Sequence, residues 1–235
     1  GLRRLRLLHQ AIVDREEQGE SLSRLLPGGI AEKVRAEGQR IGETENVVVT
    51  VLMSDIRGYS GIAERTAPAP LAHQLNEHRA AMNGALLGEE GTVMQFVGDA
   101  VMAVFGAPIA QSDHATRALA AAKAMHRAQD ELNQRWAQDG REPFGLGIGL
   151  STGEAAAALL GSAERLEYTL VGDTVNLSQR LQQWAAEGET VLSEPTWSDL
   201  SDPIVDAEWL EPSAVKGRVA PVGAWRLAAG WAVTP

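Results

Sequence analysis

Two aspartates occupy matching places in the sequence, each at the end of an apolar run. Asp55 closes the run NVVVTVLMSD, and Asp99 closes the run TVMQFVGD. If the two runs form neighbouring strands, the carboxylates lie side by side, and adjacent carboxylates repel unless a cation sits between them. Magnesium typically binds one or two carboxylates together with substrate phosphates, so the pair predicts a divalent cation site. The plainer alternative is that each aspartate is an ordinary turn or helix-start residue.

The segment that follows Asp55 is suited to an anion. It reads IRGYS from Ile56 to Ser60 and leads into a predicted helix, which Ser60 could cap. Backbone N–H groups at the start of a helix favour phosphate, so Gly58 and Tyr59 lie where a phosphate group could bind. Every helix has such an end, so this feature alone does not predict a phosphate site. The prediction depends on the neighbouring cation site, because a triphosphate bound here would reach both.

A third stretch, EYTLVGDTVNLSQR, ends at Arg180 and contains a predicted helix that begins at Thr174. Asn176 and Arg180 lie four residues apart, and this spacing places them on one helix face. An arginine can neutralise charge that builds on a phosphorane, and an asparagine can hold a ribose. A solvated helix face is the alternative. Lys216, in AVKGR, suits a phosphate tail, although an exposed loop lysine needs no such role.

The composition limits the partners. A net charge of −10 and a pI near 5.0 make nucleic acid an unexpected partner. The chain has no cysteine, and its apolar runs fall far short of the roughly 20 residues of a membrane span. It begins with glycine, so it could be cut from a longer protein; we expect a cytoplasmic location, with membrane attachment only through an upstream segment. The histidines His73, His78, His114 and His126 lack metal-ligand spacing and are interpreted as surface or packing residues.

Periodicity and breaker residues predict the order β–α–β–β–α–β, followed by a hairpin around Gly161, a helix and further strands. This order predicts an α/β fold, an α+β sandwich with a ferredoxin-like sheet, helices on one face and additional strands and helices. Alternate glycines at 145, 147 and 149 indicate close approach of another backbone or helix. Residues 1–45 are predicted to form a helical leader that could pair with its twin or pack on its own domain, and residues 46–235 the folded domain. The predicted elements are strands at 46–54, 92–97, 101–105 and 144–153 and helices at 68–87, 113–138 and 174–186.

Five segments in this order resemble the class III nucleotidyl cyclase catalytic domain, the adenylate and guanylate cyclase family, in its bacterial type with an N-terminal transducing helix. They cover roughly Val47 to Leu227 and read VTVLMSDIRGYS, VMQFVGDAVMAVFGAP, GLGIGLSTGE, EYTLVGDTVNLSQRL and VKGR. The resemblance implies conversion of ATP to cyclic AMP and pyrophosphate, without a covalent intermediate. It also implies a head-to-tail homodimer with two shared sites, and an upstream sensor in the full-length protein.

The resemblance also assigns roles to residues of this sequence. It implies that two Mg²⁺ or Mn²⁺ ions per site bind to one chain and that the second chain completes the site around the nucleotide. The metal ligands implied are Asp55, Asp99 and the Ile56 carbonyl. The partner chain is implied to supply Gln95 and Thr169 for the base, and the catalytic residues Asn176 and Arg180 for the ribose and the transition state. Lys216 is implied to bind the triphosphate end, and Gly58, Tyr59 and Ser60 are the substrate-binding residues expected from the helix start described above.

One position departs from the family pattern. Adenylate cyclases of this family commonly carry Lys four residues before the second metal aspartate, where this chain has Gln95. A Gln amide can bond adenine or, after a flip, guanine, so we expect ATP with weaker base discrimination. Guanylate cyclase activity and a catalytically silent nucleotide-binding or dimerisation module are the alternatives. A diguanylate cyclase is not expected, because the hairpin reads FVGDAVM and not GGDEF.

Overall fold

The computed structural model describes residues 44–162, 165–202, 204, 206–213 and 221–231. The leader up to residue 43 and the candidate Lys216 lie outside the described residues, whereas Thr44 and Glu45 already belong to the first strand. The elements are β1 (Thr44–Arg57), α3 (Tyr59–Arg65), α4 (Pro68–Gly88), β2 (Thr92–Val97), β3 (Ala100–Phe105), α5 (His114–Gln138), β4 (Gly145–Ser162), β5 (Arg165–Val171), α6 (Asp173–Trp184), β6 (Thr190–Ser193), α7 (Glu194–Ser198), β7 (Ala207–Ser213) and β8 (Val222–Leu227).

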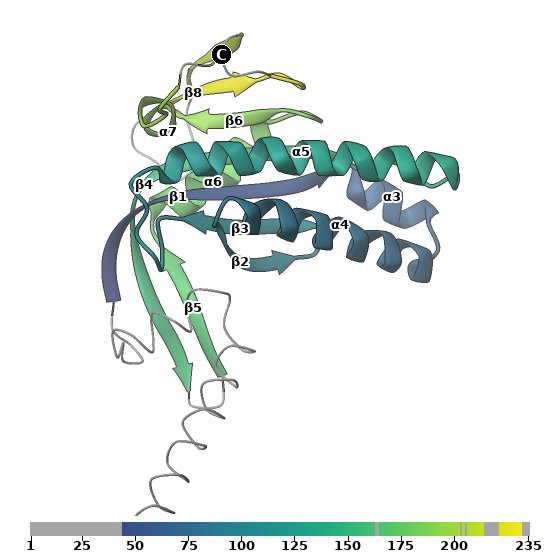
Figure 1. Cartoon of the computed structure of the whole chain (residues 1–235), viewed down its shortest axis with the longest axis horizontal. Helices are drawn as coiled ribbons and strands as arrows, with labels where there is room; N and C mark the ends of the chain where they lie inside the picture. The colour runs from purple at the N-terminus through teal and green to yellow at the C-terminus, as the bar shows by residue number, and fades with distance from the viewer. Residues whose placement is uncertain (1–43, 163–164, 203, 205, 214–220, 232–235) are drawn as a thin grey trace, which may run out of the picture.

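The sheet contains the predicted ferredoxin-like core. Its strands follow the order β2-β3-β1-β4-β6-β8-β7, with β5 paired to β4 (Figure 1). The first four strands in this order are those of the β–α–β–β–α–β unit, and β1 lies between β3 and β4, antiparallel to both. The central position of β1 follows from its apolar run, because Val49, Val51 and Leu52 are fully buried. The remaining strands extend the sheet beyond β4.

Helices cover both faces of the sheet. On one face, α4 and α5 pack against side chains such as Leu52, Ala103 and Leu150. On the other face, α6 lies against β4, where Ser178 and Gln182 approach Gly149. The expectation of helices on one face therefore holds for α4 and α5 but is wrong for α6. Figure 1 shows α5 and α4 in front of the sheet.

The alternate glycines of β4 explain the position of α6. A Cβ atom at Gly149 would lie 2.3 Å from both the backbone N of Gln182 and the backbone O of Ser178. At Gly147 it would lie 2.7 Å from Nε of Arg57. The predicted close approach is thus confirmed, since only a strand without side chains on this face lets a helix backbone come so near.

Several predicted boundaries differ from the structure. The first strand continues past Ser54 because Asp55, Ile56 and Arg57 still pair with β4. The hairpin does not turn at Gly161, which pairs with Leu166 inside the ladder. The strand β7 was not predicted at all, because its sequence AEWLEPS has no clear alternation of apolar and polar residues.

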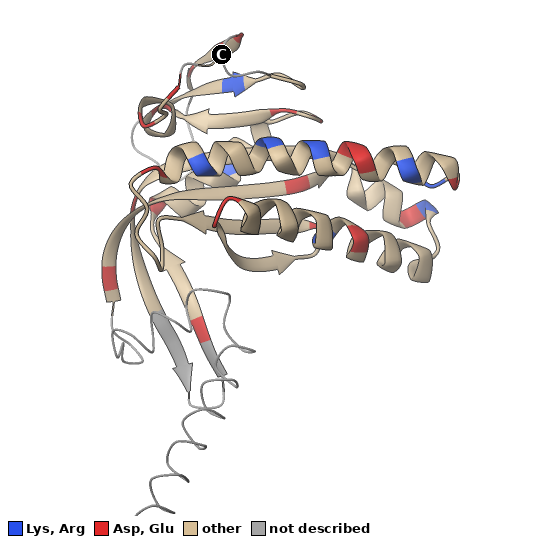
Figure 2. Ribbon diagram, in the orientation of Figure 1, with Lys and Arg blue, Asp and Glu red and all other residues tan. Residues whose placement is uncertain are grey.

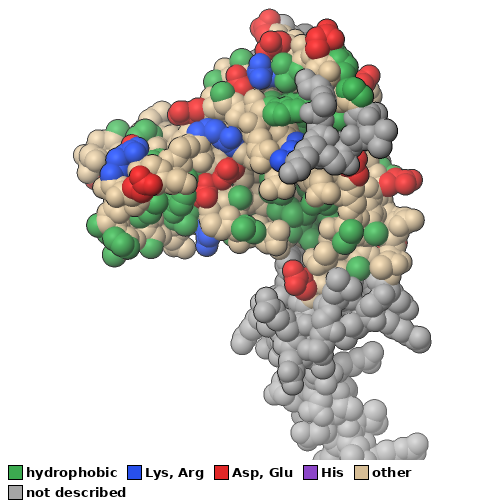
Figure 3. Space-filling view, turned by 180° about the vertical axis from the view of Figure 1, so that it is seen from behind, with side chains coloured by type: hydrophobic (Ala, Val, Ile, Leu, Met, Phe, Trp, Pro, Cys, Tyr) green, Lys and Arg blue, Asp and Glu red, His purple; other side chains and the backbone are tan. Residues whose placement is uncertain are grey.

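Charges of both signs are mixed over the surface. Figure 2 shows basic and acidic residues interspersed along α4 and α5, and Figure 3 shows separate apolar patches among charged side chains on the opposite side. No helix within the described ranges is both long enough and apolar enough to cross a membrane.

His126 makes the folded state sensitive to acid. Its Nε2 lies 3.0 Å from Oγ1 of the buried Thr190, and burial lowers the pKa of the imidazole from 6.5 to about 4. The unfolded chain therefore takes up a proton that the folded chain excludes, so stability falls as the pH drops from 6.5 towards 4. We expect protonation of His126 to lower the free energy of unfolding by up to about 3 kcal/mol over this pH range.

The variant His126→Gln checks this expectation, because it keeps a polar group near Thr190 but does not titrate. Urea unfolding between pH 7 and about pH 4.5 should show a smaller loss of stability for the variant than for the unchanged chain. Parallel pH dependences would show that His126 is not the group responsible.

Candidate functional site

The two aspartates converge on one backbone nitrogen. Asp55 lies near the end of β1, and Asp99 lies in the turn between β2 and β3. The N–H of Ile56 donates to Oδ1 of Asp55 at 3.1 Å and to Oδ2 of Asp99 at 3.2 Å. Both carboxylates are thereby neighbours, as the sequence predicted, because β1 pairs with β3 and brings the hairpin turn to the end of β1.

The pair is electrostatically unfavourable without a counter-charge. Burial raises the pKa of Asp55 to about 6, Asp99 adds to the rise through a hydrogen bond and its charge, and Arg57 opposes it. Two carboxylates that resist joint ionisation are suited to a hard divalent cation. No cluster of three or more His, Cys, Asp or Glu side chains that could hold a metal occurs in the described part of the chain. A cation here would therefore complete its coordination with backbone oxygen, water and substrate phosphate.

Residues that the sequence did not reveal hold this pair in place. Arg79, on α4, donates to the carbonyl of Gly98 and lies 5.4 Å over the ring of Phe96, which fixes the turn that carries Asp99. The side chain of Ile56 is buried among aromatic and aliphatic residues on the α4–α5 face, so its backbone is held firmly beside the carboxylates. No spacing in the sequence links α4 to the hairpin turn.

The candidate phosphate-binding segment adjoins the aspartates. Gly58 has φ of +68° and precedes α3, so a backbone conformation suited to glycine ends β1 and begins the helix. Tyr59 meets Phe144 edge to face at 6.0 Å, and burial together with Asp99 raises the pKa of its hydroxyl. Ser60 lies inside the first turn and does not cap it, so the predicted cap is wrong.

The other candidates form a second group. Asn176 and Arg180 point outward from α6, since the residues of α6 that are buried include Leu177, Ser178 and Leu181. Arg180 donates through Nη1 to Oε1 of Gln183 at 3.2 Å. The side chain of Asn176 is thus exposed, and that of Arg180 is partly exposed.

Gln95 and Thr169 lie on two different strands. Gln95 is exposed on β2, and its Nε2 lies 3.8 Å from Sδ of Met102. Thr169 is half-buried on β5, opposite Ala158 of β4. No hydrogen bond joins Gln95 to Thr169 within the part of the chain that the structure describes.

Asn176 is distant from the aspartate pair within one chain, and Arg180 lies on the outer side of α6, whereas Ser178 and Gln182 face β4. Asp55 is opposite Gly147 on β4, whereas Thr174 at the start of α6 lies over Gly153. The six residues from Gly147 to Gly153 span roughly 20 Å along β4. Asn176 is only about 3 Å further along α6 than Thr174, which does not close this distance. A phosphate held at Asp55 would therefore be out of reach of Asn176 from the same chain.

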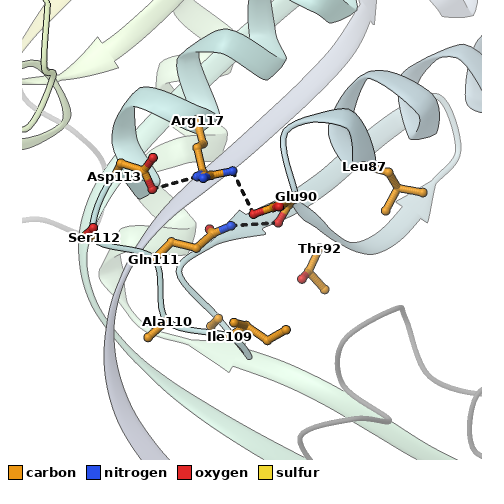
Figure 4. A pocket seen from close by; sticks show the side chains of 11 residues that line it. Leu87, Glu90, Thr92, Ile109, Ala110, Gln111, Ser112, Asp113 and Arg117 are labelled. Atoms are coloured by element: carbon orange, nitrogen blue, oxygen red, sulfur yellow. Dashed lines mark hydrogen bonds and ion pairs between the residues drawn. The ribbon is translucent and has the colours of Figure 1, made fainter.

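A pocket of about 650 Å³ lies away from both groups, at the opposite end of the β2–β3 hairpin from Asp99 (Figure 4). Arg117 reaches Asp113 at 2.8 Å and Glu90 at 2.9 Å across it, and Nε2 of Gln111 donates to the Glu90 carbonyl at 3.1 Å. Its charged side chains thus pair with one another, and none of the predicted site residues lines it.

Comparison with known proteins identifies relatives of this arrangement. Residues 42–228 match the family model described as the adenylate and guanylate cyclase catalytic domain. Adenylate cyclase 1 of Rhizobium meliloti is 34% identical over 134 residues, which are 57% of this chain and 20% of that protein. An adenylate cyclase of Mycobacterium tuberculosis is 31% identical over 201 residues, 83% of this chain and 44% of that protein. The chain thus spans less than half of the length of either protein.

Solved structures agree with these matches. The crystal structure of an adenylyl cyclase from P. aeruginosa superposes with a TM-score of 0.74 at 32% identity, covering 82% of this chain and 96% of that one. The guanylate cyclase domain from Catenaria anguillulae in complex with GTP gives a TM-score of 0.69 at 27% identity, covering 79% and 99%. The relatives thus include cyclases named for either base.

Proposed function

Because this chain belongs to the adenylate and guanylate cyclase catalytic domain family, we propose that it converts ATP to 3′,5′-cyclic AMP and pyrophosphate. The observation that carries the proposal is the convergence of Asp55 and Asp99 on the N–H of Ile56. Two carboxylates beside a segment that favours phosphate suit a cation-bound triphosphate.

The aspartates and the Ile56 carbonyl would hold two Mg²⁺ or Mn²⁺ ions per site. When bound, such ions lower the pKa of the ribose 3′-hydroxyl and neutralise charge on the triphosphate. Gly58, Tyr59 and Ser60 would position the phosphates beside this group. The triphosphate end would be bound by Lys216, which lies outside the described residues.

Asn176 and Arg180 would act from a second copy of the chain. The Arg180 guanidinium would bind the α-phosphate oxygens as the 3′-oxygen attacks in line, and Asn176 would orient the ribose. The distance between Asn176 and Asp55 within one chain, and the direction of Arg180 away from the sheet, support this sharing. A head-to-tail homodimer with two equivalent sites brings the halves together.

Exposed apolar side chains support a dimer. Val97 precedes the Asp99 turn and is 60% exposed, and Val171 follows Thr169 and is also 60% exposed. Large apolar side chains at these positions would lose contact with water if a second copy covered them. Both flank a candidate half-site, so one interface would cover them while completing the sites.

The base would be read by Gln95 and Thr169. A glutamine offers a donor and an acceptor, and a threonine hydroxyl offers both, so the pair can bond adenine. The same groups could accept guanine after a flip of the amide, and we therefore propose a preference for ATP that is weaker than with lysine at this position.

We also propose a role for the leader. Residues 1–43 would form a transducing helix that links the domain, which begins with β1 at Thr44, to an upstream sensor, in a protein located in the cytoplasm. This chain covers only 20% and 44% of the lengths of the two curated relatives named above, and a longer protein with a sensor is consistent with these fractions.

Parallel assays with ATP and GTP test the proposed function. The purified chain, supplied with Mn²⁺ or Mg²⁺, is expected to release cyclic AMP faster than cyclic GMP, with the GTP rate still measurable because of Gln95. Cyclic nucleotide and pyrophosphate should appear in equal amounts. A verified dimer that binds ATP but yields neither product would indicate the silent nucleotide-binding module instead.

A further inference from the structure

Arg57 lies beside the aspartate pair, on the same face of β1 as Asp55, because residues two apart in a strand face the same way. Its guanidinium occupies the space that Gly147 leaves on β4, where a Cβ atom would lie 2.7 Å from Nε and 2.9 Å from Nη2. The side chain is only 25% exposed. The missing side chain at Gly147 of β4 therefore leaves space for the Arg57 guanidinium next to Asp55.

Two nitrogens of this guanidinium lack partners. Nε and Nη2 of Arg57 are buried and make no hydrogen bond with any described residue. These two N–H groups form one edge of the guanidinium, the fork that matches both oxygens of a carboxylate. The nearest acidic group is Asp55, whose Oδ2 lies 3.9 Å from Nη2, so a small rotation of the carboxylate would satisfy the fork.

Asp55 thus lies among several hydrogen-bond donors, of which only the Arg57 guanidinium carries a positive charge. In the present geometry its Oδ1 accepts from the N–H of Ile56, on the side shared with Asp99. Nη2 of the Arg57 fork lies 3.9 Å from Oδ2 of Asp55, and a hydrogen bond with the Gln182 side chain also acts on this carboxylate, lowering its pKa. Buried donors without acceptors are unfavourable, so the unsatisfied Arg57 fork favours rotation of Asp55 towards it.

We propose that Arg57 is a built-in counter-ion that competes with the divalent cation for the Asp55 carboxylate and thereby weakens cation binding in the absence of nucleotide. The proposal rests on the proposed function in taking Asp55 and Asp99 as the cation ligands. The negative phosphates of a nucleotide would offset the Arg57 charge, so cation and nucleotide bind together more readily than the cation does alone. Arg57 is a positioning residue, since it acts through Asp55.

Titration of the nucleotide-free chain with Mn²⁺, followed by electron paramagnetic resonance, tests the proposal. The measurement is made at about pH 8.5, well above the raised pKa of Asp55. The variant Arg57→Met keeps the length of the side chain but removes the charge. Repulsion between Arg57 and a divalent ion at roughly 6 Å corresponds to about a tenfold change in Kd even with the dielectric constant of water, so Arg57→Met should bind Mn²⁺ about tenfold more tightly.

Two further variants sharpen the result. Arg57→Lys keeps the charge and should bind within about threefold of the unchanged chain. Arg127→Met removes an exposed arginine of α5, and should leave the Kd unchanged because solvent and salt screen its charge. Arg57→Gln replaces Arg57→Met if the latter fails to give the native circular dichroism spectrum. An unchanged or weaker Mn²⁺ affinity in a folded neutral variant would overturn the proposal.

A binding measurement on Asp55→Ala separates this inference from the proposed function. If Asp55→Ala loses Mn²⁺ binding while the folded neutral Arg57 variant shows no gain, only the counter-ion role fails. If Asp55→Ala binds Mn²⁺ as tightly as the unchanged chain, the cation site itself is misplaced, and the proposed function loses its main support together with the counter-ion role.

Discussion

Chains carrying Asp55→Ala and chains carrying Arg180→Ala should each be inactive alone and should regain activity when mixed. The first change removes a carboxylate that would hold the cations, and the second removes the charge that would stabilise the transition state. Each loss is expected to lower kcat by at least about 1,000-fold, as for removal of one essential electrostatic group. Recovery on mixing is expected because, in the proposed shared site, Asp55 and Arg180 come from different chains.

The size of the recovery follows from symmetry. In a head-to-tail dimer, a mixed pair has one site with both defects and one site with none. Random pairing makes about half of the dimers mixed, so the mixture should reach about a quarter of the unchanged activity. Co-expression with two different affinity tags would isolate the mixed dimers, and a coupled pyrophosphate assay would measure their rate.

Matched mixtures provide the control. Asp55→Ala mixed with Asp99→Ala should stay inactive, because both changes affect the same half of the site and no mixed dimer has an intact site. The pair Asn176→Ala and Arg180→Ala should stay inactive for the same reason. Continued inactivity of the Asp55→Ala and Arg180→Ala mixture, in dimers shown to be mixed, would contradict the shared site.

Gly149→Ala should destabilise the fold strongly. The added Cβ would lie 2.3 Å from the backbone of α6 at both Ser178 and Gln182, and backbone atoms cannot rotate away as a side chain can. The helix would have to shift off the sheet, which we expect to cost about 3 kcal/mol or more in the free energy of unfolding. For a chain of this size such a loss lowers Tm by about 10 °C.

Gly84→Ala is the matched control for this change. Gly84 is exposed on α4, and a Cβ there would meet no atom within 4 Å. Alanine is favoured over glycine within a helix, so this variant should be about 0.5–1 kcal/mol more stable than the unchanged chain. Equal stability of Gly149→Ala and the unchanged chain, measured by urea unfolding, would show that α6 does not depend on the glycine.

Much of the core could be predicted from local patterns. The apolar run before Asp55, the alternating residues around the Gly98–Asp99 turn and the long alanine-rich helix have strong periodicity, and their order restricts the sheet to few topologies. Pairing of β1 with the following hairpin was then enough to predict that Asp55 and Asp99 are neighbours. The alternate glycines likewise predicted a close approach, although not which element makes it.

Other features depend on contacts between residues distant in the sequence. The position of α6 on the second face, the Arg79 contact that fixes the Asp99 turn and the unsatisfied fork of Arg57 have no periodic signal. Each results from packing between elements that lie far apart in the chain, and local propensity carries no information about such pairs. The sequence by itself determined the chemistry of Asp55 and Asp99, because a carboxylate keeps its charge and ligand type in any fold. Only the tertiary structure decided that Asn176 lies out of reach of Asp55 within one chain, because that separation is set by the register of β4 against β1 and α6.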